Sequence, residues 1–348
     1  MISVILPAYN TGPYITQCLR SILRQTYRDL EVIVVNDAST DESLTVAREF
    51  EKSDKRVKVI NLLVNKGVEQ VRMIGLKEAK GEYVMFVDSD DWLCGRDTLE
   101  AMHKKMEETG ADYVEVRSQR VMDSWGLIKT KSSSPVYGLI RQPELFDDYY
   151  ISFFGKNVLS VTMWGKLYRR ATLDKADLTP CGLKMGEDLH FNMKLFPHLQ
   201  SIYIMDKIGY NYRFGGMTTR YNPTLLSDLK KLFVVKDKLS KQQHFDSAHD
   251  FLRIELKNVF RSDICQRIIF DFGEKSDILF KIREEMIDPV YEEVQKVRNT
   301  PGFLDDPFVK AMAEKDVDSI YNHCLLLVRK GRWQRFQKKI VSFLLRII

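Results

Sequence analysis

The sequence predicts an open α/β sheet followed by a helical region, on three observations. Over residues 1–117, short apolar runs of strand character alternate with segments of helical spacing. Beyond about residue 222, long helical periodicities replace this alternation. The apolar run Tyr83–Val87 indicates a buried strand, and it ends in three closely spaced carboxylates.

The first half of the chain alternates between strands and helices. The first strand, Ile2–Leu6, is an apolar run that stops at a proline. A helix is expected from Pro13, because proline suits a first helical turn and apolar residues follow at helical spacing. Leu30–Val35 is a second apolar strand, and the turn and capping residues Asp37–Asp41 introduce a second helix. The next elements follow in order: strand Val57–Leu62, helix Lys66–Ala79, strand Tyr83–Val87, helix Thr98–Thr109 and strand Asp112–Arg117. Such an alternation predicts parallel strands whose C-terminal ends form one ligand-binding edge.

The second half changes character. Residues 118–160 show a mixed pattern with a loop at 132–135. Compact α/β character returns from Thr162 to about Tyr212, with a strand at Ile202–Met205. Four long helices are then expected: Leu225–Leu239, Phe251–Phe270, Ile278–Val297 and Phe308–Val328. These patterns predict a domain over 1–220, a helical region over 221–328 and a tail over 329–348.

Cysteine and histidine usage indicates neither a disulfide framework nor a zinc site. The five cysteines are scattered without a CxxC pair, and the six histidines include no HxxxH pair. A reducing cytosol fits this pattern. The apolar N-terminus is too short for a signal peptide, and no apolar run approaches the roughly 18 residues of a membrane span. We therefore expect a soluble or peripheral protein.

The basic charge of the chain is concentrated in its tail. The net charge is +5, but residues 329–348 carry seven Lys and Arg residues and no acid, so the remainder has a charge of −2. This distribution argues against a general nucleic-acid binder, which would carry a basic stripe on its main domain.

The tail also has an amphipathic pattern. Its apolar and aromatic residues fall on one helical face: Trp333, Phe336, Ile340, Phe343, Leu344 and Ile347. A basic helix of this kind is typical of an anchor on an anionic membrane surface. The alternative is that the tail packs on the helical region or on a second copy, as in a homodimer formed through the C-terminal helices.

The acidic strand end is the clearest chemical signal. Asp88, Asp90 and Asp91 place three carboxylates at the edge of a buried strand, which is costly unless a positive group neutralises them. A hard divalent cation is one candidate, and an acidic turn followed by a helix N-cap is the other. Neither GxGxxG nor GxxxxGK(S/T) occurs, which disfavours dinucleotide oxidoreductases and P-loop enzymes. A diphosphate held through a metal fits the acidic strand end.

Five segments stand in a recognisable order and spacing: Val4–Asn10, Ser21–Tyr27, Val34–Asp41, Asn65–Gly67 and Gly81–Trp92. They resemble the bacterial family 2 glycosyltransferases of the GT-A fold. The resemblance covers about residues 1–220. It implies a Rossmann-like nucleotide-diphospho-sugar transferase domain, with a donor half over about 1–117, an acceptor half over about 118–220 and a C-terminal helical extension.

On the donor side, the resemblance implies a UDP-linked sugar. Asp37 would accept the uracil imide hydrogen; its alternative role is a helix N-cap. Asp88 and Asp90 would form the family's DXD pair and hold Mn²⁺ or Mg²⁺ on the donor diphosphate, with Asp90 the direct ligand. Arg72 matches a family arginine, with a surface arginine as the alternative, and Arg213 would cover the diphosphate from a loop with paired glycines. The other donor-binding residues implied are Pro7, Tyr9, Asn10, Lys66 and Ser89.

On the acceptor side, the segment around Glu187 resembles the family's Glu-Asp motif ahead of a helix. This makes Asp188 the catalytic base of a single inverting displacement; the alternative is that both acids cap the helix. Trp164 would form a wall against the sugar, or pack in the core. Lys166 would support the acceptor or a phosphate. Glu187 and Asp91 complete the acceptor-binding residues that the resemblance implies.

The sequence therefore predicts a metal-dependent inverting glycosyltransferase that moves a sugar from UDP to a glycan acceptor. The expected acceptor is a lipid-linked oligosaccharide, for capsule, exopolysaccharide or O-antigen synthesis, and the expected location is cytoplasmic and peripheral on the inner face of a bacterial membrane. A polyprenyl phosphate or wall polymer is the alternative acceptor. A non-catalytic scaffold relative would lack one of Asp88, Asp90 and Asp188, and a nucleotidyltransferase would show a Gly-rich signature near residue 10; the sequence shows neither feature.

Overall fold

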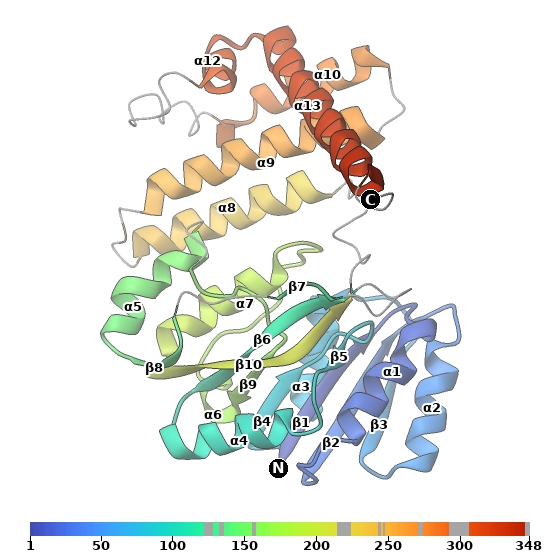
Figure 1. The fold of residues 1–348 in the computed structure, drawn as a ribbon. Helices are drawn as coiled ribbons and strands as arrows, with labels where there is room; N and C mark the ends of the chain where they lie inside the picture. Colours follow the sequence, from blue (N-terminus) through green and yellow to red (C-terminus); the bar gives the residue numbers. More distant parts are fainter. Residues whose placement is uncertain are drawn as a thin grey trace. The chain divides into compact units, whose positions relative to one another are not determined.

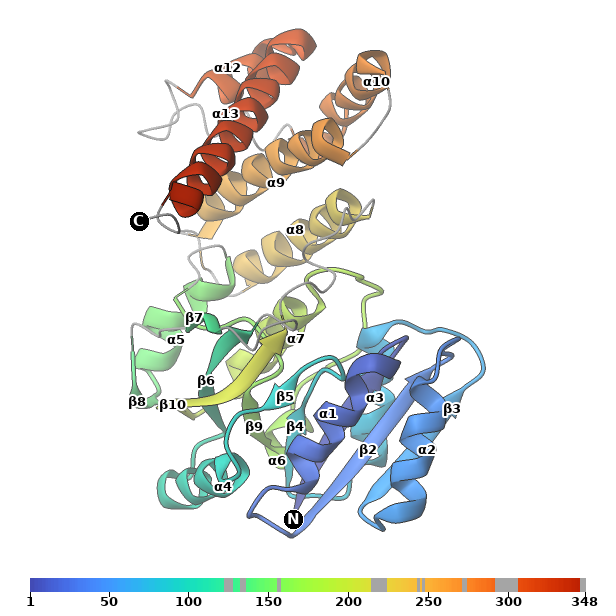
Figure 2. The same cartoon turned by 45° about the vertical axis from the view of Figure 1, so that its right-hand side comes forward.

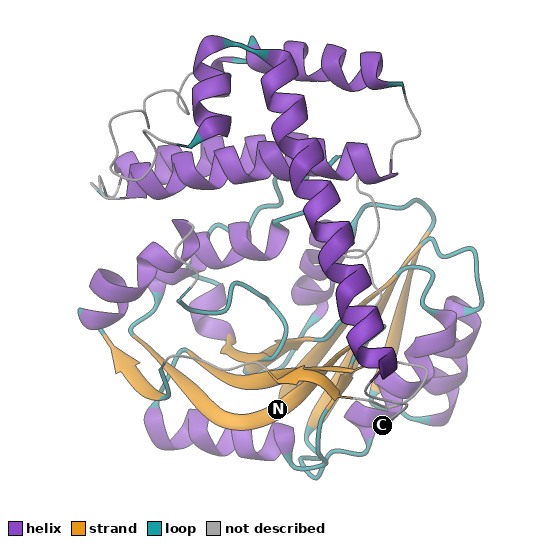
Figure 3. Cartoon of the chain, turned by 45° about the horizontal axis from the view of Figure 1, so that its top comes forward, coloured by secondary structure: helices purple, strands orange, loops and turns teal. Residues whose placement is uncertain are grey.

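The computed structural model describes most of the chain, in these ranges: 1–121, 128–131, 136–154, 158–213, 224–242, 245, 248–270, 274–291 and 306–344. The chain folds into two compact units, Met1–Arg220 and Tyr221–Ile348 (Figure 1). The described strands all belong to the first unit, and the second unit is built from helices (Figure 3). This confirms the predicted fold class, an α/β sheet with a C-terminal helical extension.

One mixed sheet forms the first unit, in the order β3-β2-β1-β4-β9-β6-β10-β5, with β7 beside β6 and β8 beside β10. Four strands pair in parallel, as the sequence predicts: β1 (Ile2–Ala8), β2 (Leu30–Asp37), β3 (Val57–Leu62) and β4 (Tyr83–Phe86). The sequence did not predict β9 (Lys166–Arg169), which runs antiparallel between β4 and β6 (Tyr113–Val121). The other strands are β5 (Trp92–Leu93), β7 (Ile128–Lys131), β8 (Gly138–Arg141) and β10 (Ser201–Arg213).

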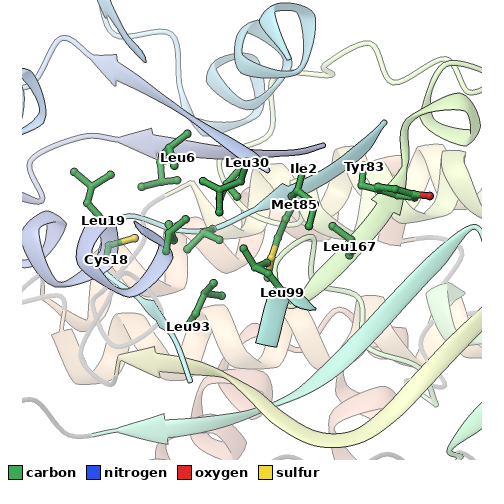
Figure 4. Close-up of a cluster of buried hydrophobic side chains, with 14 of the residues drawn as sticks. Ile2, Leu6, Cys18, Leu19, Leu30, Tyr83, Met85, Leu93, Leu99 and Leu167 are labelled. Carbon is green, nitrogen blue, oxygen red and sulfur yellow. The ribbon is translucent and has the colours of Figure 1, made fainter. Parts of the chain in front are cut away.

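A hydrophobic core covers one face of the parallel strands. Because side chains alternate along a strand, Ile2, Val4 and Leu6 of β1 point to this face together. They pack with apolar side chains of three helices, α1 (Gly12–Leu23), α2 (Ser43–Ser53) and α4 (Thr98–Thr109). Figure 4 shows Cys18 and Leu19 of α1 and Leu99 of α4 in this cluster.

The opposite face carries the helices that build the candidate site. Ile5 of β1 points to this face, toward Gly75 of α3 (Val68–Glu78). A Cβ on Gly75 would come within 2.4 Å of Ile5 Cγ2, so α3 approaches the sheet as closely as glycine allows. Phe86 pairs with Ile5 in register and contacts the ring of Phe191 in α7 (Glu187–Leu195) at 5.8 Å between centroids. Helices α3 and α7 therefore cover the same face of the sheet.

The remaining helices of the first unit are short. They are α5 (Glu144–Tyr149), α6 (Arg170–Leu173) and the 3-10 helices η1 (Tyr150–Phe154) and η2 (Phe196–His198).

The second unit is a set of packed helices. They are α8 (Leu225–Gln242), α9 (Ala248–Phe270), α10 (Lys275–Met286), α12 (Pro307–Glu314) and α13 (Val317–Leu344). Helix α8 packs on α9, and α13 packs on α9, α10 and α12 (Figures 1 and 2). Among the described helices, none has the length and apolar character to span a membrane.

Two of the predicted long helices differ from those observed. The expected helix Phe308–Val328 is two helices, because Lys315 adopts a left-handed conformation with φ of 54° and ends α12. The expected helix Ile278–Val297 is confirmed over Ile278–Met286, which lies in α10, but α10 ends at Met286, and residues 292–297 lie outside the described residues. The tail begins inside α13, but its side chains beyond Gly331 lie outside the described part of the chain, so its predicted apolar face is not described.

Candidate active site

The candidate site lies where the acidic segment leaves β4. Residues Asp88–Asp91 form a tight turn in which the amide of Asp91 donates to the carbonyl of Asp88 at 3.0 Å. The amide of Asp88 donates to the hydroxyl of Tyr210 in β10 at 3.1 Å. The turn that carries the carboxylates is thus held both by its own backbone and by a distant strand of the same sheet.

Arg72 of α3 is the central contact of the site. Its side chain is buried, and its guanidinium nitrogens lie 2.7 Å from Asp88 Oδ1 and 2.7 Å from Asp188 Oδ1. Glu187 Oε1 lies 3.4 Å from the same guanidinium. Burial alone would lower the pKa of Arg72, but the three carboxylates raise it above its ordinary value. The surface-arginine alternative is therefore wrong, and one buried cation joins the acidic strand end to the acidic start of α7.

Asp188 and Glu187 stand in the first turn of α7. The N-cap is Gly186 and forms no side-chain cap hydrogen bond, so the alternative that these acids serve as the helix cap finds no support. Asp188 Oδ2 accepts from the amide of Met163 at 3.1 Å, while Oδ1 meets Arg72. Burial raises the pKa of Asp188, against the lowering effect of Arg72. Burial and the neighbouring Asp188 also raise the pKa of Glu187, to about 7.

Asp90 and Asp91 differ in exposure. Burial, assisted by the charge of Asp88, raises the pKa of Asp90 to about 6. Asp91 is 1% exposed, and burial followed by the charges of Asp90 and Asp88 raises its pKa well above the usual range. Asp91 Oδ1 accepts from the amide of Arg213 at 2.7 Å, whereas Oδ2 is buried without a partner among the described residues. This placement contradicts the expectation that Asp91 touches the acceptor, because its carboxylate faces the interior.

Arg213, at the end of β10, is packed against the acidic turn. Its Nε donates to the carbonyl of Asp90 at 2.6 Å, and Nη2 donates to Gln17 Oε1 at 2.7 Å. The guanidinium lies over the rings of Tyr14 and Trp92, 4.4 and 4.7 Å from their centroids. The side chain is thus held beside the carboxylates, while Gly215 and Gly216 of the predicted loop lie outside the described residues.

Asp37 ends β2 and fixes the loop before α3. Its two carboxylate oxygens accept from the amides of Lys66 and Gly67, at 2.7 and 2.9 Å. The N-cap alternative for Asp37 is wrong, because α2 begins only at Ser43, whose amide donates to Asp41 at 2.9 Å. Asp37 thus lies next to the backbone of Lys66, and the Lys66 side chain is exposed.

The end of β1 carries further predicted donor-binding residues. Pro7 is buried in the strand, whereas Tyr9 is 51% exposed just beyond it. Asn10 has a φ of 52°, and its Oδ1 accepts from the amide of Thr40 at 2.9 Å. The buried hydroxyl of Ser89 lies 3.0 Å from that of Thr11, which ties this strand end to the acidic turn.

Two predicted acceptor residues have structural contacts. Trp164 stacks on Tyr210, with centroids 4.6 Å apart, and on Tyr212, 5.5 Å apart, so it packs against β10 while remaining partly exposed. Lys166 is fully buried, and its ammonium donates to the carbonyls of Ser160 and Thr162, each at 2.8 Å. This contradicts the expectation that Lys166 supports the acceptor or a phosphate.

Sequence reasoning missed several residues that shape the site. They are Tyr14 and Gln17 of α1, Trp92 of β5, Met163 and Tyr210. Two signals were present in the sequence: Trp92 ends the segment Gly81–Trp92 of the family resemblance, and the three-residue spacing of Tyr14 and Gln17 places both on one side of α1. The partners meet across long separations, such as the 196 residues between Gln17 and Arg213, which no local pattern reveals.

Comparison with known proteins gives consistent matches. Residues 3–176 match the family described as glycosyl transferase family 2. Glycosyltransferase GlyA of Streptococcus pneumoniae is 34% identical over 217 residues, 61% of this chain and 30% of that protein. Poly(ribitol-phosphate) beta-N-acetylglucosaminyltransferase TarS of Staphylococcus aureus is 32% identical over 216 residues, 60% of this chain and 35% of TarS.

The fold is also shared with a solved structure. A crystal structure of S. aureus TarS in complex with UDP-GlcNAc matches with a TM-score of 0.59 and 22% identity, covering 95% of this chain and 92% of that chain. At this identity the match shows the fold alone. The chain spans about a third of the length of the curated relatives GlyA and TarS.

Proposed function

The chain belongs to glycosyl transferase family 2, and from this premise we propose that it transfers a sugar from a UDP-linked donor to a glycan acceptor with inversion. The observation that carries the proposal is the contact of Arg72 with both Asp88 and Asp188. Through it, an acidic strand end suited to a donor diphosphate lies beside a carboxylate suited to an acceptor hydroxyl.

The proposed donor is a UDP-sugar. The relative TarS has been crystallised with UDP-GlcNAc, which supports this choice. Asp37 would accept the imide hydrogen of uracil. Although its oxygens already accept from two backbone amides, a carboxylate has about four lone-pair sites and can accept a further hydrogen bond.

Asp88 and Asp90 would hold Mn²⁺ or Mg²⁺. Burial and the charge of Asp88 raise the pKa of Asp90 to about 6, which supports a site where a cation would stabilise the two carboxylates. Within the described residues, Asp88, Asp90 and Asp91 do not converge as a three-ligand cluster. A cation at this site would therefore be bound by one or two of these carboxylates, and the phosphates of the substrate would complete its coordination shell. When bound, the cation would stabilise negative charge on the departing UDP.

Asp188 is the proposed base of the displacement. The acceptor oxygen forms a bond to the anomeric carbon as the bond from that carbon to the UDP oxygen breaks, and UDP leaves with the electron pair. The hydroxyl proton passes to the Asp188 carboxylate. The charge of Arg72 opposes the effect of burial on the pKa of Asp188 and so favours the ionised form that the transfer requires. Glu187 would contribute to acceptor binding from the same helical turn.

The proposed acceptor is a lipid-linked glycan used in capsule, exopolysaccharide or O-antigen synthesis. A wall polymer is the second candidate, because the relative TarS is named for transfer to poly(ribitol phosphate). For either acceptor, the basic tail would place the enzyme on the inner membrane face, where lipid-linked intermediates are available.

The proposal is tested by measuring UDP release from a panel of UDP-sugars, with both acceptor classes and with or without Mn²⁺. We expect metal-dependent transfer from one of the UDP-sugars to one of the acceptors. Asp188→Asn should abolish transfer while UDP binding measured by calorimetry remains nearly intact, because Asn keeps the shape of the side chain and an oxygen that accepts from Arg72 but cannot take the proton. Loss of UDP affinity in this variant would instead place Asp188 on the donor side, and the absence of transfer from every UDP-sugar would contradict the proposed donor.

A further inference from the structure

A second group of metal-ligating side chains lies outside the proposed donor site. Glu69 of α3, Cys181 before α7 and His190 within α7 bring a carboxylate oxygen, a sulfur and a ring nitrogen within 4.8 Å of one another. His190 Nδ1 lies 3.3 Å from Glu69 Oε1, and Cys181 Sγ lies 3.6 Å from the same oxygen. Among the described residues, this is the one group of three such ligands that converges.

These separations match the geometry that zinc imposes on its ligands. Zinc binds sulfur at about 2.3 Å and nitrogen or oxygen at about 2.0 Å, so tetrahedral ligands lie roughly 3.3–3.5 Å apart. The separations of Glu69 Oε1 from His190 Nδ1 and from Cys181 Sγ, 3.3 and 3.6 Å, fall close to these values. A thiolate and an imidazole together favour zinc over the hard cations Mg²⁺ and Ca²⁺, which prefer oxygen ligands.

The ligands are held in place by the fold around them. Glu69 accepts from the amides of Cys181 and Gly182, at 3.0 and 2.8 Å, which fixes the loop against α3. Gly182 has a φ of 75°, a conformation that glycine adopts without strain. His190 is 4% exposed, whereas Cys181 is exposed to solvent, so a metal ion can enter from the Cys181 side.

We propose that Glu69, Cys181 and His190 form a Zn²⁺ site with a fourth position open to water. Helices α3 and α7, both labelled in Figure 1, would be bridged by the ion, and they carry Arg72 and Asp188. Glu69 precedes Arg72 by one helical turn, and His190 follows Asp188 by two residues. Bound zinc therefore fixes the two helices behind the Arg72–Asp188 contact and acts as a structural clamp. This binding proposal stands independently of the proposed sugar transfer.

The experiment uses the full chain, freed of metal with a chelator and kept in excess Mg²⁺ to occupy the hard oxygen site. Co²⁺ serves as the first probe, because a thiolate ligand gives a sulfur-to-cobalt charge-transfer absorption that Asp and His ligands do not. Zn²⁺ affinity is then measured by competition with a chromophoric chelator. We expect one Co²⁺ per chain with the sulfur band, and displacement of Co²⁺ by Zn²⁺.

Matched variants decide the assignment. Cys181→Ser should abolish the sulfur band, and Glu69→Gln and His190→Gln should each weaken Zn²⁺ binding by at least about tenfold. Cys94→Ser and His198→Gln replace the same residue types elsewhere in the first unit and should bind as the parent does. Circular dichroism and UDP binding establish that each variant is folded. Binding without a sulfur band, or binding that survives Cys181→Ser, would overturn the proposal and leave Glu69 and His190 as a simple ion pair.

Discussion

At the scale of single residues, the folded protein holds Asp90 where its charge is unfavourable. The folded pKa of about 6 lies above the usual value of 3.8. A group whose pKa is raised by folding binds its proton more tightly in the folded protein. Its contribution to the free energy of unfolding is therefore fully present below its unfolded pKa and is lost as the pH rises through its folded pKa. In the metal-free protein, Asp90 therefore costs stability at neutral pH, as is common where function requires an unfavourable group.

Replacing this carboxylate separates stability from function. At pH 7.5 and without metal, Asp90→Asn should raise the free energy of unfolding by about 1–2 kcal/mol, since it removes a desolvated charge. The gain should disappear near pH 4, where Asp90 itself is protonated, and this serves as an internal control. The same variant should lose metal-dependent UDP binding. Denaturant unfolding at the two pH values and calorimetry measure both effects; a variant that is less stable at pH 7.5 would contradict the raised pKa.

The sequence motifs identified residues of the candidate site more successfully than they predicted what those side chains contact. The sequence assigned Asp88 and Arg72 to the donor side and Asp188 to the acceptor side, and the structure shows that Arg72 contacts both carboxylates. It did not reveal that Asp91 and Lys166 point inward, because burial depends on strands that are distant in sequence. The zinc ligands were invisible for the same reason, since they are spread over residues 69, 181 and 190 and form no local spacing.

At the scale of elements, the position of α3 depends on Gly75. Its missing Cβ would lie 2.4 Å from Ile5 Cγ2 and 3.4 Å from Val35 Cγ2, so the helix cannot keep its position with a larger residue. The contact therefore sets how close Arg72, one turn earlier on α3, comes to the strand ends.

Gly75→Ala should destabilise the protein by about 1–2 kcal/mol, because the overpacking exceeds the gain in helix propensity. Transfer activity should also fall, since α3 carries Arg72. Ile5→Ala alone should cost about 3 kcal/mol, but it removes the clashing methyl group. The double variant should therefore lose less stability than the sum of the two single variants, as measured by denaturant unfolding. Strict additivity would show that the contact does not constrain α3.

Helices and strands were predictable where their own residues carry a clear pattern of apolar spacing. The strands β1, β2 and β4 are mostly apolar runs, β3 places Val57 and Val59 on one face, and α4 was predicted with its observed bounds, Thr98–Thr109. The short strands β5, β8 and β9 were not predicted, because two to four residues carry too little periodicity and their pairing partners lie far away. The break at Lys315 was missed since a lysine in the left-handed conformation has no sequence signature.

At the scale of the whole molecule, the proposed membrane contact is a property of the charge distribution rather than of the catalytic unit. Replacing Arg332, Arg335, Lys338 and Lys339 together by Gln should release the protein from anionic vesicles. At about 1 kcal/mol for each charge, binding should weaken roughly a thousandfold. Co-sedimentation with anionic and zwitterionic vesicles measures the effect, and only the anionic binding should depend on these residues. Equal sedimentation of parent and variant would favour the alternative that the tail packs on protein.

The strand order has a consequence for synthesis on the ribosome. Strands β1–β4 are neighbours and complete by Phe86, so they can pair as the chain emerges. Strand β6 ends at Val121, yet both of its neighbours in the main sheet come later, with β9 starting at Lys166 and β10 at Ser201. At roughly 5–20 residues per second, the edges of β4 and β6 wait several seconds for β9. During that interval the nascent chain displays unpaired strand edges on β4 and β6, the surfaces most prone to aggregation, and this is the stage at which a chaperone would matter most.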